Sequence, residues 1–78
     1  MSADGEEQWA ERTKRFLKAE LKRADVTYEQ LAERLSAMGF TETKASIANK
    51  VSRGTFSAAF LIASLKAVEC RTLRVDDV

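Results

Sequence analysis

The sequence is short of the residues that interrupt helices: its 78 residues include no proline and only three glycines. Proline removes a backbone donor and glycine is a poor helix former, so a chain with so few of them can be helical over most of its length. Alternating runs of β-branched residues, which are typical of strands, are missing as well. We therefore expect an all-α fold and, at this length, a single small domain with a modest core.

The chain also lacks histidine and has one cysteine, Cys70. A metal site would therefore consist of carboxylates alone, and no such cluster stands out, so we expect neither a metal nor another cofactor. The sequence offers no motif-placed nucleophile and no glycine-rich phosphate loop, which argues against an enzyme. Since Cys70 follows an apolar helix, we interpret it as a buried or half-buried structural thiol.

Long apolar runs are missing too. With no signal peptide or membrane-length segment, and one cysteine that has no partner for an intramolecular disulfide, the sequence predicts a reduced, cytoplasmic setting and no membrane partner. Neither sign of charge dominates, because 13 lysines and arginines against 12 acids give a net charge of +1. The overall charge does not indicate a nucleic-acid partner, and only the arrangement of the charges can do so.

Helical periodicity is what the sequence does contain. Residues 1–5 predict a flexible N-terminal tail, and residues 6–78 a single domain whose first helix runs from Glu6 or Gln8 to Ala24. Four basic residues share the face of this helix that lies opposite its apolar face: Lys14, Arg15, Lys18 and Lys22. That face is either a solvated surface or a source of phosphate contacts that do not depend on DNA sequence.

Capping residues mark three further helices. The first lies between Thr27 and Gly39 and begins with a Thr27–Gln30 capping box. The second covers about residues 44–53, is capped by Thr41 or Thr43, and stops at Gly54. The third covers about residues 58–69 and is capped by Thr55 or Ser57. Residues 70–78 predict either a short extended segment or a frayed helical turn.

The helix over residues 44–53 has an unusual polar face. Ile47, Ala48 and Val51 point to one side. The opposite side carries Ser46, Asn49, Lys50 and Arg53. Helix surfaces that serve solubility alone usually mix glutamate with lysine, but this face has no acid. Hydroxyl, amide and cationic groups are the types that hydrogen-bond to base edges and phosphates, so the face predicts nucleic-acid binding.

The surrounding sequence adds a resemblance. From Tyr28 to about Val68, a capped amphipathic helix, a glycine-containing turn and a short basic helix resemble the λ-repressor-like helix-turn-helix domains of the Cro and repressor type. The matching residues are Leu31-Ala32, Asn49 and Arg53-Gly54. The stretch "NKVSRGTFSAAF" is also similar to a small, uncharacterised bacterial helix-turn-helix family. The resemblance implies a compact bundle of four to five helices and a small bacterial transcriptional regulator that binds double-stranded DNA.

The same resemblance implies roles for individual residues, with the helix over residues 44–53 in the major groove. Ser46, Asn49 and Lys50 would face the groove, Thr43 and Lys44 would meet a phosphate or a base edge, and Arg53 would reach the backbone. For Arg53 the alternative is a cation that complements the helix dipole. For the whole chain the alternative is a protein-interaction domain that keeps the helix-turn-helix fold without DNA contacts.

The helix over about residues 58–69 is apolar nearly all round, which indicates burial on two sides. Its second side is covered either by the first helix, through Trp9 and Phe16, or by a second copy of the chain in a homodimer. The candidate interface residues are Phe56, Phe60, Ala63, Ala67, Leu73 and Val75, with the segment around Leu73 pairing as a strand across a two-fold axis.

Overall fold

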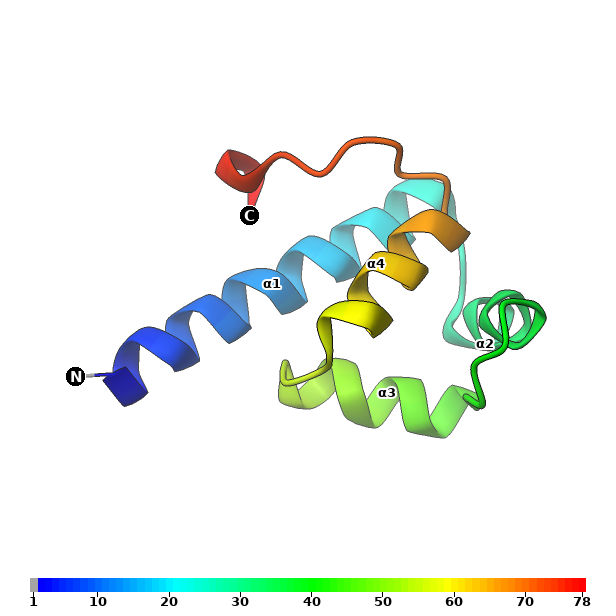
Figure 1. The fold of residues 1–78 in the computed structure, drawn as a ribbon, viewed down its shortest axis with the longest axis horizontal. Helices are drawn as coiled ribbons and strands as arrows, with labels where there is room; N and C mark the ends of the chain where they lie inside the picture. Colours follow the sequence, from blue (N-terminus) through cyan, green and yellow to red (C-terminus); the bar gives the residue numbers. More distant parts are fainter. Residues whose placement is uncertain (1) are drawn as a thin grey trace.

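The computed structural model describes residues 2–78, with side chains from Gly5 onward. Over these residues the chain forms four α-helices and a final 3-10 turn, without a strand, which confirms the all-α prediction (Figure 1). The elements are α1 (Ser2–Ala24), α2 (Tyr28–Ala37), α3 (Lys44–Arg53), α4 (Ala58–Ala67) and η1 (Val75–Asp77). None of the helices described is long and apolar enough to cross a membrane.

The helix α1 begins earlier than the sequence predicts. Its backbone is helical from Ser2 rather than from Glu6 or Gln8, so the expected tail is corrected for residues 2–5, and Met1 lies outside the described residues. Acidic residues such as Glu6 and Glu7 stabilise the first turns of a helix because they complement its dipole. This effect extends α1 beyond the part that has an apolar face.

Hydrogen bonds at the ends of α2 match the prediction. The Thr27 hydroxyl accepts from the Gln30 backbone N–H at 3.1 Å, and the Gln30 side chain accepts from the Thr27 N–H at 2.9 Å, which completes the capping box. Gly39 has φ +94° and ends the helix in a left-handed conformation. The next N–H, of Phe40, donates to the Leu35 carbonyl at 3.0 Å. This is a Schellman motif, and it brings Phe40 against the core.

The helices α3 and α4 start at residues that the sequence offered as alternatives. Thr43 caps α3 and Ser57 caps α4. The bounds of α3 are as predicted, but α4 ends at Ala67 rather than near Glu69. Glu69 has φ +60°, and the following N–H, of Cys70, donates to the Leu65 carbonyl at 2.9 Å. A second Schellman motif therefore ends α4 early, without a glycine.

All four helices contribute to one core, whose most buried apolar side chains are Leu17, Leu31, Leu35, Ile47, Val51 and Phe60. Phe60 is 1% exposed and Ala63 is 8% exposed within the single chain. The expectation that these two residues form a dimer interface is therefore wrong, because the monomer core already covers them. Phe56 and Ala67 are partly buried against the same core, whereas Leu73 and Val75 remain exposed.

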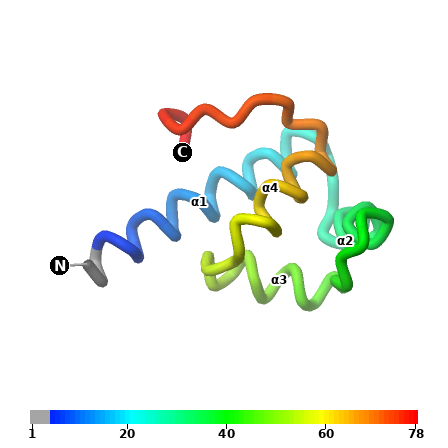
Figure 2. The backbone as a smooth tube through the Cα atoms, in the orientation of Figure 1, coloured from blue at the N-terminus to red at the C-terminus, as the bar shows by residue number. Residues whose placement is uncertain are grey.

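The C-terminal segment runs back beside α1 (Figure 2). It contains no strand and ends in the turn η1. The predicted helical turn therefore forms only at Val75–Asp77, and residues 70–74 before it are neither helix nor strand. The Arg12 guanidinium anchors this end by donating to the Val78 backbone oxygen at 2.7 Å. The same guanidinium carbon lies 4.0 Å from the centroid of the Trp9 ring, which is half-exposed.

Candidate nucleic-acid interface

The helix α3 lies along one edge of the molecule, with its outer side uncovered by the other helices (Figure 1). Ile47 and Val51 fix its inner side in the core, at 0% and 1% exposure. The residues of α3 that are exposed are Lys44, Ala45, Asn49, Ser52 and Arg53. We call this set the outer face of α3. It contains two cations, an amide, a hydroxyl and no carboxylate.

Two of the residues with a predicted DNA contact also form hydrogen bonds at the start of α3. The Thr43 hydroxyl accepts from the Ser46 N–H at 3.1 Å, and the Ser46 hydroxyl accepts from the Thr43 N–H at 2.8 Å. The Ser46 hydroxyl also donates to the Glu42 carboxylate at 2.6 Å. Both hydroxyls therefore act in a capping box; the sequence analysis offers Thr43 as a cap but gives Ser46 no part in it.

Lys50 is also engaged within the domain. Its ammonium group pairs with the carboxylate of Glu42, and it lies 5.0 Å from the centroid of the Phe60 ring. Burial raises the pKa of Glu42, but hydrogen bonds from Lys50 and Ser46 and the charge of Lys50 outweigh it, so the pKa is below its ordinary value. The carboxylate is therefore ionised at neutral pH.

Sequence reasoning missed Glu42 because a helical wheel includes only the residues of the helix. Glu42 precedes the capping residue Thr43, and the turn of the chain there carries its side chain back over α3 to Lys50. The sequence did contain one indication of this contact. Glu42 stands next to a capping threonine in a short connection, so its side chain has to stay close to α3. The polar face of α3 is thus free of acid in sequence but has one carboxylate beside it in space.

The C-terminal end of α3 packs against α1. Gly54 ends α3 with φ +70°, and a Cβ atom added there would lie 3.0 Å from the Ala10 carbonyl oxygen. The Lys14 ammonium donates to the Ser52 carbonyl at 3.4 Å. Arg53 is exposed at this end of α3, which Lys14 of α1 also reaches.

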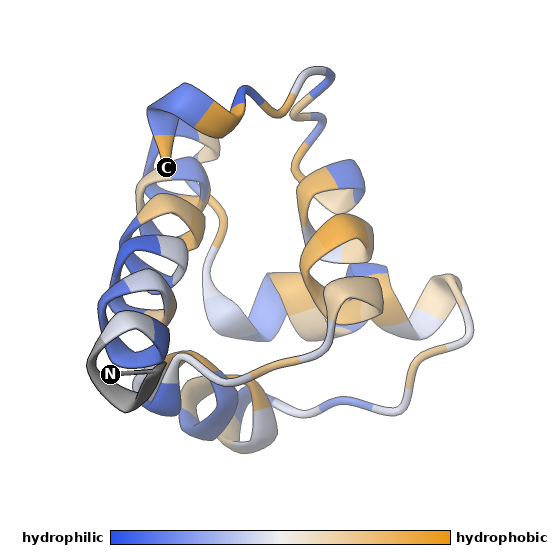
Figure 3. Cartoon of the chain, turned by 60° about the vertical axis from the view of Figure 1, so that its left-hand side comes forward, coloured by the Kyte–Doolittle hydropathy of each residue, from blue (hydrophilic) through white to orange (hydrophobic). Residues whose placement is uncertain are grey.

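The four basic residues that are predicted to share one face of α1 divide into two groups, on a helix whose surface is largely hydrophilic (Figure 3). Lys14 and Arg15 flank the Glu11 carboxylate at 3.2 and 3.1 Å. A hydrogen bond from Lys14 and its charge, with a smaller effect of Arg15, hold the pKa of Glu11 below its ordinary value. Lys18 and Lys22 are exposed, and no ion pair of theirs occurs among the described residues.

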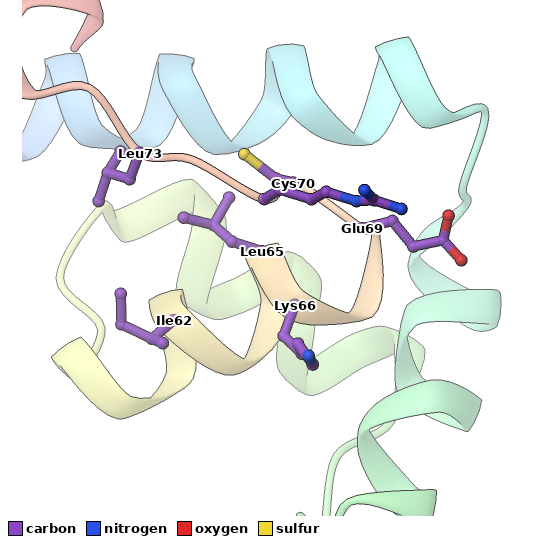
Figure 4. A pocket seen from close by; sticks show the side chains of 7 residues that line it. Ile62, Leu65, Lys66, Glu69, Cys70 and Leu73 are labelled. Atoms are coloured by element: carbon purple, nitrogen blue, oxygen red, sulfur yellow. The ribbon is translucent and has the colours of Figure 1, made fainter.

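A second surface feature is a groove between α4 and the C-terminal segment (Figure 4). Ile62 and Leu73 line it and are 55% and 37% exposed. Lys66, Glu69 and Arg71 also line the groove. Cys70 lies in it half-buried, as its position after α4 predicts, and the thiol is 3.5 Å from the Thr72 carbonyl oxygen.

Comparison with known proteins identifies a family for the chain but no activity. No curated protein and no solved structure matches it significantly. One family model matches residues 9–73, from within α1 to the C-terminal segment. The description of that family states no function, so the resemblance to λ-repressor-like domains stays a prediction. The match covers most of the sequence, and the chain belongs to the family described as Domain of unknown function (DUF6471).

Proposed function

We propose that the domain binds double-stranded DNA, as a small bacterial transcriptional regulator, with α3 as the recognition helix. The observation that carries the proposal is the outer face of α3, which presents cations, an amide and a hydroxyl to solvent. The adjacent carboxylate, Glu42, is buried and neutralised by Lys50, so it does not repel a phosphate backbone from this face.

The residues of this face suit different parts of a duplex. Asn49 lies in the middle of α3, where an amide can donate to and accept from an adenine edge. Lys44 and Arg53 lie at the two ends of the helix, and their charges suit the phosphates on either side of the groove. Lys14, beside Ser52, lies at the Arg53 end as well, but its ammonium group is paired with Glu11.

The test is a selection of random duplexes on the purified protein, followed by affinity measurements on the enriched sequence. Asn49→Ala should weaken binding to that sequence by about 1–3 kcal/mol. Gln8→Ala is the matched control, since Gln8 is an exposed amide on α1. Both variants should keep the wild-type melting temperature. Equal affinities of the two variants would contradict the assignment of α3, and a selection without an enriched motif would contradict sequence-specific binding.

The finer proposal is that the regulator acts as a homodimer in the cytoplasm, since two half-site contacts joined in one molecule bind far more tightly than one. With Phe60 and Ala63 in the monomer core, Ile62 and Leu73 in the groove beside α4 are the exposed apolar residues that support it. Sedimentation equilibrium at micromolar concentration tests this, with Ile62→Glu as the disrupting variant. A wild-type chain that stays monomeric on DNA as well as alone would contradict it.

A second candidate function is protein interaction without DNA. It is favoured by the hydrogen bonds and the ion pair that Thr43, Ser46 and Lys50 form within the domain. These contacts leave α3 with fewer free polar groups than the sequence predicts. The dependence of duplex affinity on salt separates the two functions. Phosphate contacts give a steep loss of affinity with rising salt, whereas a protein-interaction domain binds no duplex even at low salt.

A further inference from the structure

Lys50 of α3 is partly exposed, but its charge is already paired within the domain. The Lys50 side chain is 42% exposed, so it lies within reach of a ligand that approaches α3. Its ammonium group nevertheless pairs with Glu42, whose own side chain is only 5% exposed. The Phe60 ring lies under the same ammonium, at 5.0 Å from its centroid. The Lys50 ammonium is thus held in place by Glu42 and the Phe60 ring.

The partner of Lys50 is itself fixed. One oxygen of the Glu42 carboxylate accepts from the Ser46 hydroxyl at 2.6 Å, and the other pairs with Lys50. That hydroxyl also belongs to the capping box that starts α3. If Lys50 left to contact a phosphate, a buried carboxylate would lose its counter-charge, which is strongly destabilising. The ion pair therefore competes with any external anion for Lys50.

We infer that Glu42 withholds Lys50 from the DNA backbone and so limits the number of phosphate contacts that α3 makes. The inference rests on the DNA binding proposed above. In this arrangement Lys44 and Arg53 supply the phosphate contacts of the helix, and Lys50 stabilises its start. Phosphate contacts raise affinity for every sequence, whereas base contacts discriminate between sequences. Withholding one lysine therefore lowers non-specific affinity and leaves the reading of bases by Asn49 intact.

Four proteins test the inference: the wild type, Glu42→Gln, Lys50→Gln and the double variant. Each is titrated with the selected duplex over a range of salt, and the slope of log K against log salt is compared. Glu42→Gln keeps the shape of the side chain but releases Lys50, so its slope should steepen by about 0.9, the value for one added phosphate contact. Lys50→Gln alone and the double variant should both keep the wild-type slope.

The matched control is Glu7→Gln. It changes the net charge of the chain as Glu42→Gln does, but at an exposed glutamate of α1. Its slope should equal that of the wild type, which separates release of Lys50 from a general change in charge. A slope that steepens equally in both variants would overturn the inference.

Two results separate failure of the inference from failure of DNA binding. If the wild type binds the duplex and Lys50→Gln flattens its slope by about 0.9, then Lys50 contacts a phosphate and the inference is wrong while DNA binding stands. If Glu42→Gln leaves the slope unchanged, the inference is wrong in the same way. If no duplex binds to the wild type at low salt, DNA binding fails and the inference with it.

Thermal unfolding gives a readout that needs no DNA. Lys50→Gln should lower the melting temperature by several degrees, because it leaves the buried Glu42 carboxylate unpaired. Adding Glu42→Gln to that variant should restore most of the loss, since the charge is then removed. A Lys50→Gln protein that melts at the wild-type temperature would show that the ion pair does not persist in solution, and would overturn the inference.

Discussion

Replacing Gly54 with alanine tests the packing that fixes the end of α3 against α1. Gly54 has φ +70°, a left-handed conformation that costs a residue with a side chain about 1 kcal/mol. The added Cβ would also lie 3.0 Å from the Ala10 carbonyl oxygen, a contact so tight that one of the two atoms must move by a few tenths of an ångström. Because that oxygen belongs to the backbone of α1, relief requires a helix to move, and overpacking of this kind costs about 1–3 kcal/mol. We expect Gly54→Ala to lose about 2–4 kcal/mol of stability in total.

Gly39→Ala is the matched control. Gly39 also has positive φ, at +94°, but a Cβ atom added there would have no neighbour within 4 Å. It should lose only the conformational part, about 1 kcal/mol. Urea unfolding followed by circular dichroism gives both free energies of unfolding. The removal of the neighbouring methyl group, by Ala10→Gly, should not rescue Gly54→Ala because the closest atom is the carbonyl oxygen. Equal losses in Gly54→Ala and Gly39→Ala would refute the proposed contact between α3 and α1.

Four other variants or conditions have defined outcomes. Ser64→Ala should raise the free energy of unfolding by about 1 kcal/mol, since the Ser64 hydroxyl is buried without a hydrogen-bond partner among the described residues; a loss of stability in chemical denaturation would contradict this. Glu69→Gly should add about 1 kcal/mol by relieving a left-handed glutamate, and an unchanged melting temperature would count against it. The pKa of Glu42 is lowered on folding, so its stabilising effect is present above the ordinary value of 4.5 and disappears as pH falls below it; Glu42→Gln should flatten this part of the stability profile. Replacing Lys18 and Lys22 with glutamine should reduce the salt slope of duplex binding by about 2 without changing the preferred sequence, and an unchanged slope would make these residues a solvated surface.

The helix positions could be predicted from sequence wherever a local hydrogen bond decides them. Thr27 with Gln30, and Gly54 at the end of α3, carry their structural meaning in the residue type itself, and the structure has them as predicted. The end of α4 could not be predicted because Glu69, a good helix former, takes a left-handed conformation there. The neighbouring burial of Val68 and the partial burial of Cys70 decide that turn, and burial depends on the whole fold.

In the candidate site, too, some features could be predicted from the sequence and others could not. The exposure of Asn49 and Arg53 follows from the period of the helix, so the wheel was sufficient for them. The engagement of Lys50 was not predictable from the wheel, since its partner lies outside the helix. Phe60 was assigned to either a core or an interface because both sides of α4 are apolar, and only the packing of α1 and α2 on that helix decides between them.

The turns that end α1, α2 and α4 share one construction, with consequences for how the backbone opens. Each has a left-handed residue, Asp25, Gly39 or Glu69, and each is followed at once by a residue that packs on the core. Such a helix end unravels only if that next side chain also leaves the core, so fraying there is coupled to burial. We expect the amides of these turns to exchange with deuterium at rates close to those of the helices they end. Fast exchange is expected at residues 6–9 of α1 and in the exposed segment before η1, where no buried side chain holds the backbone.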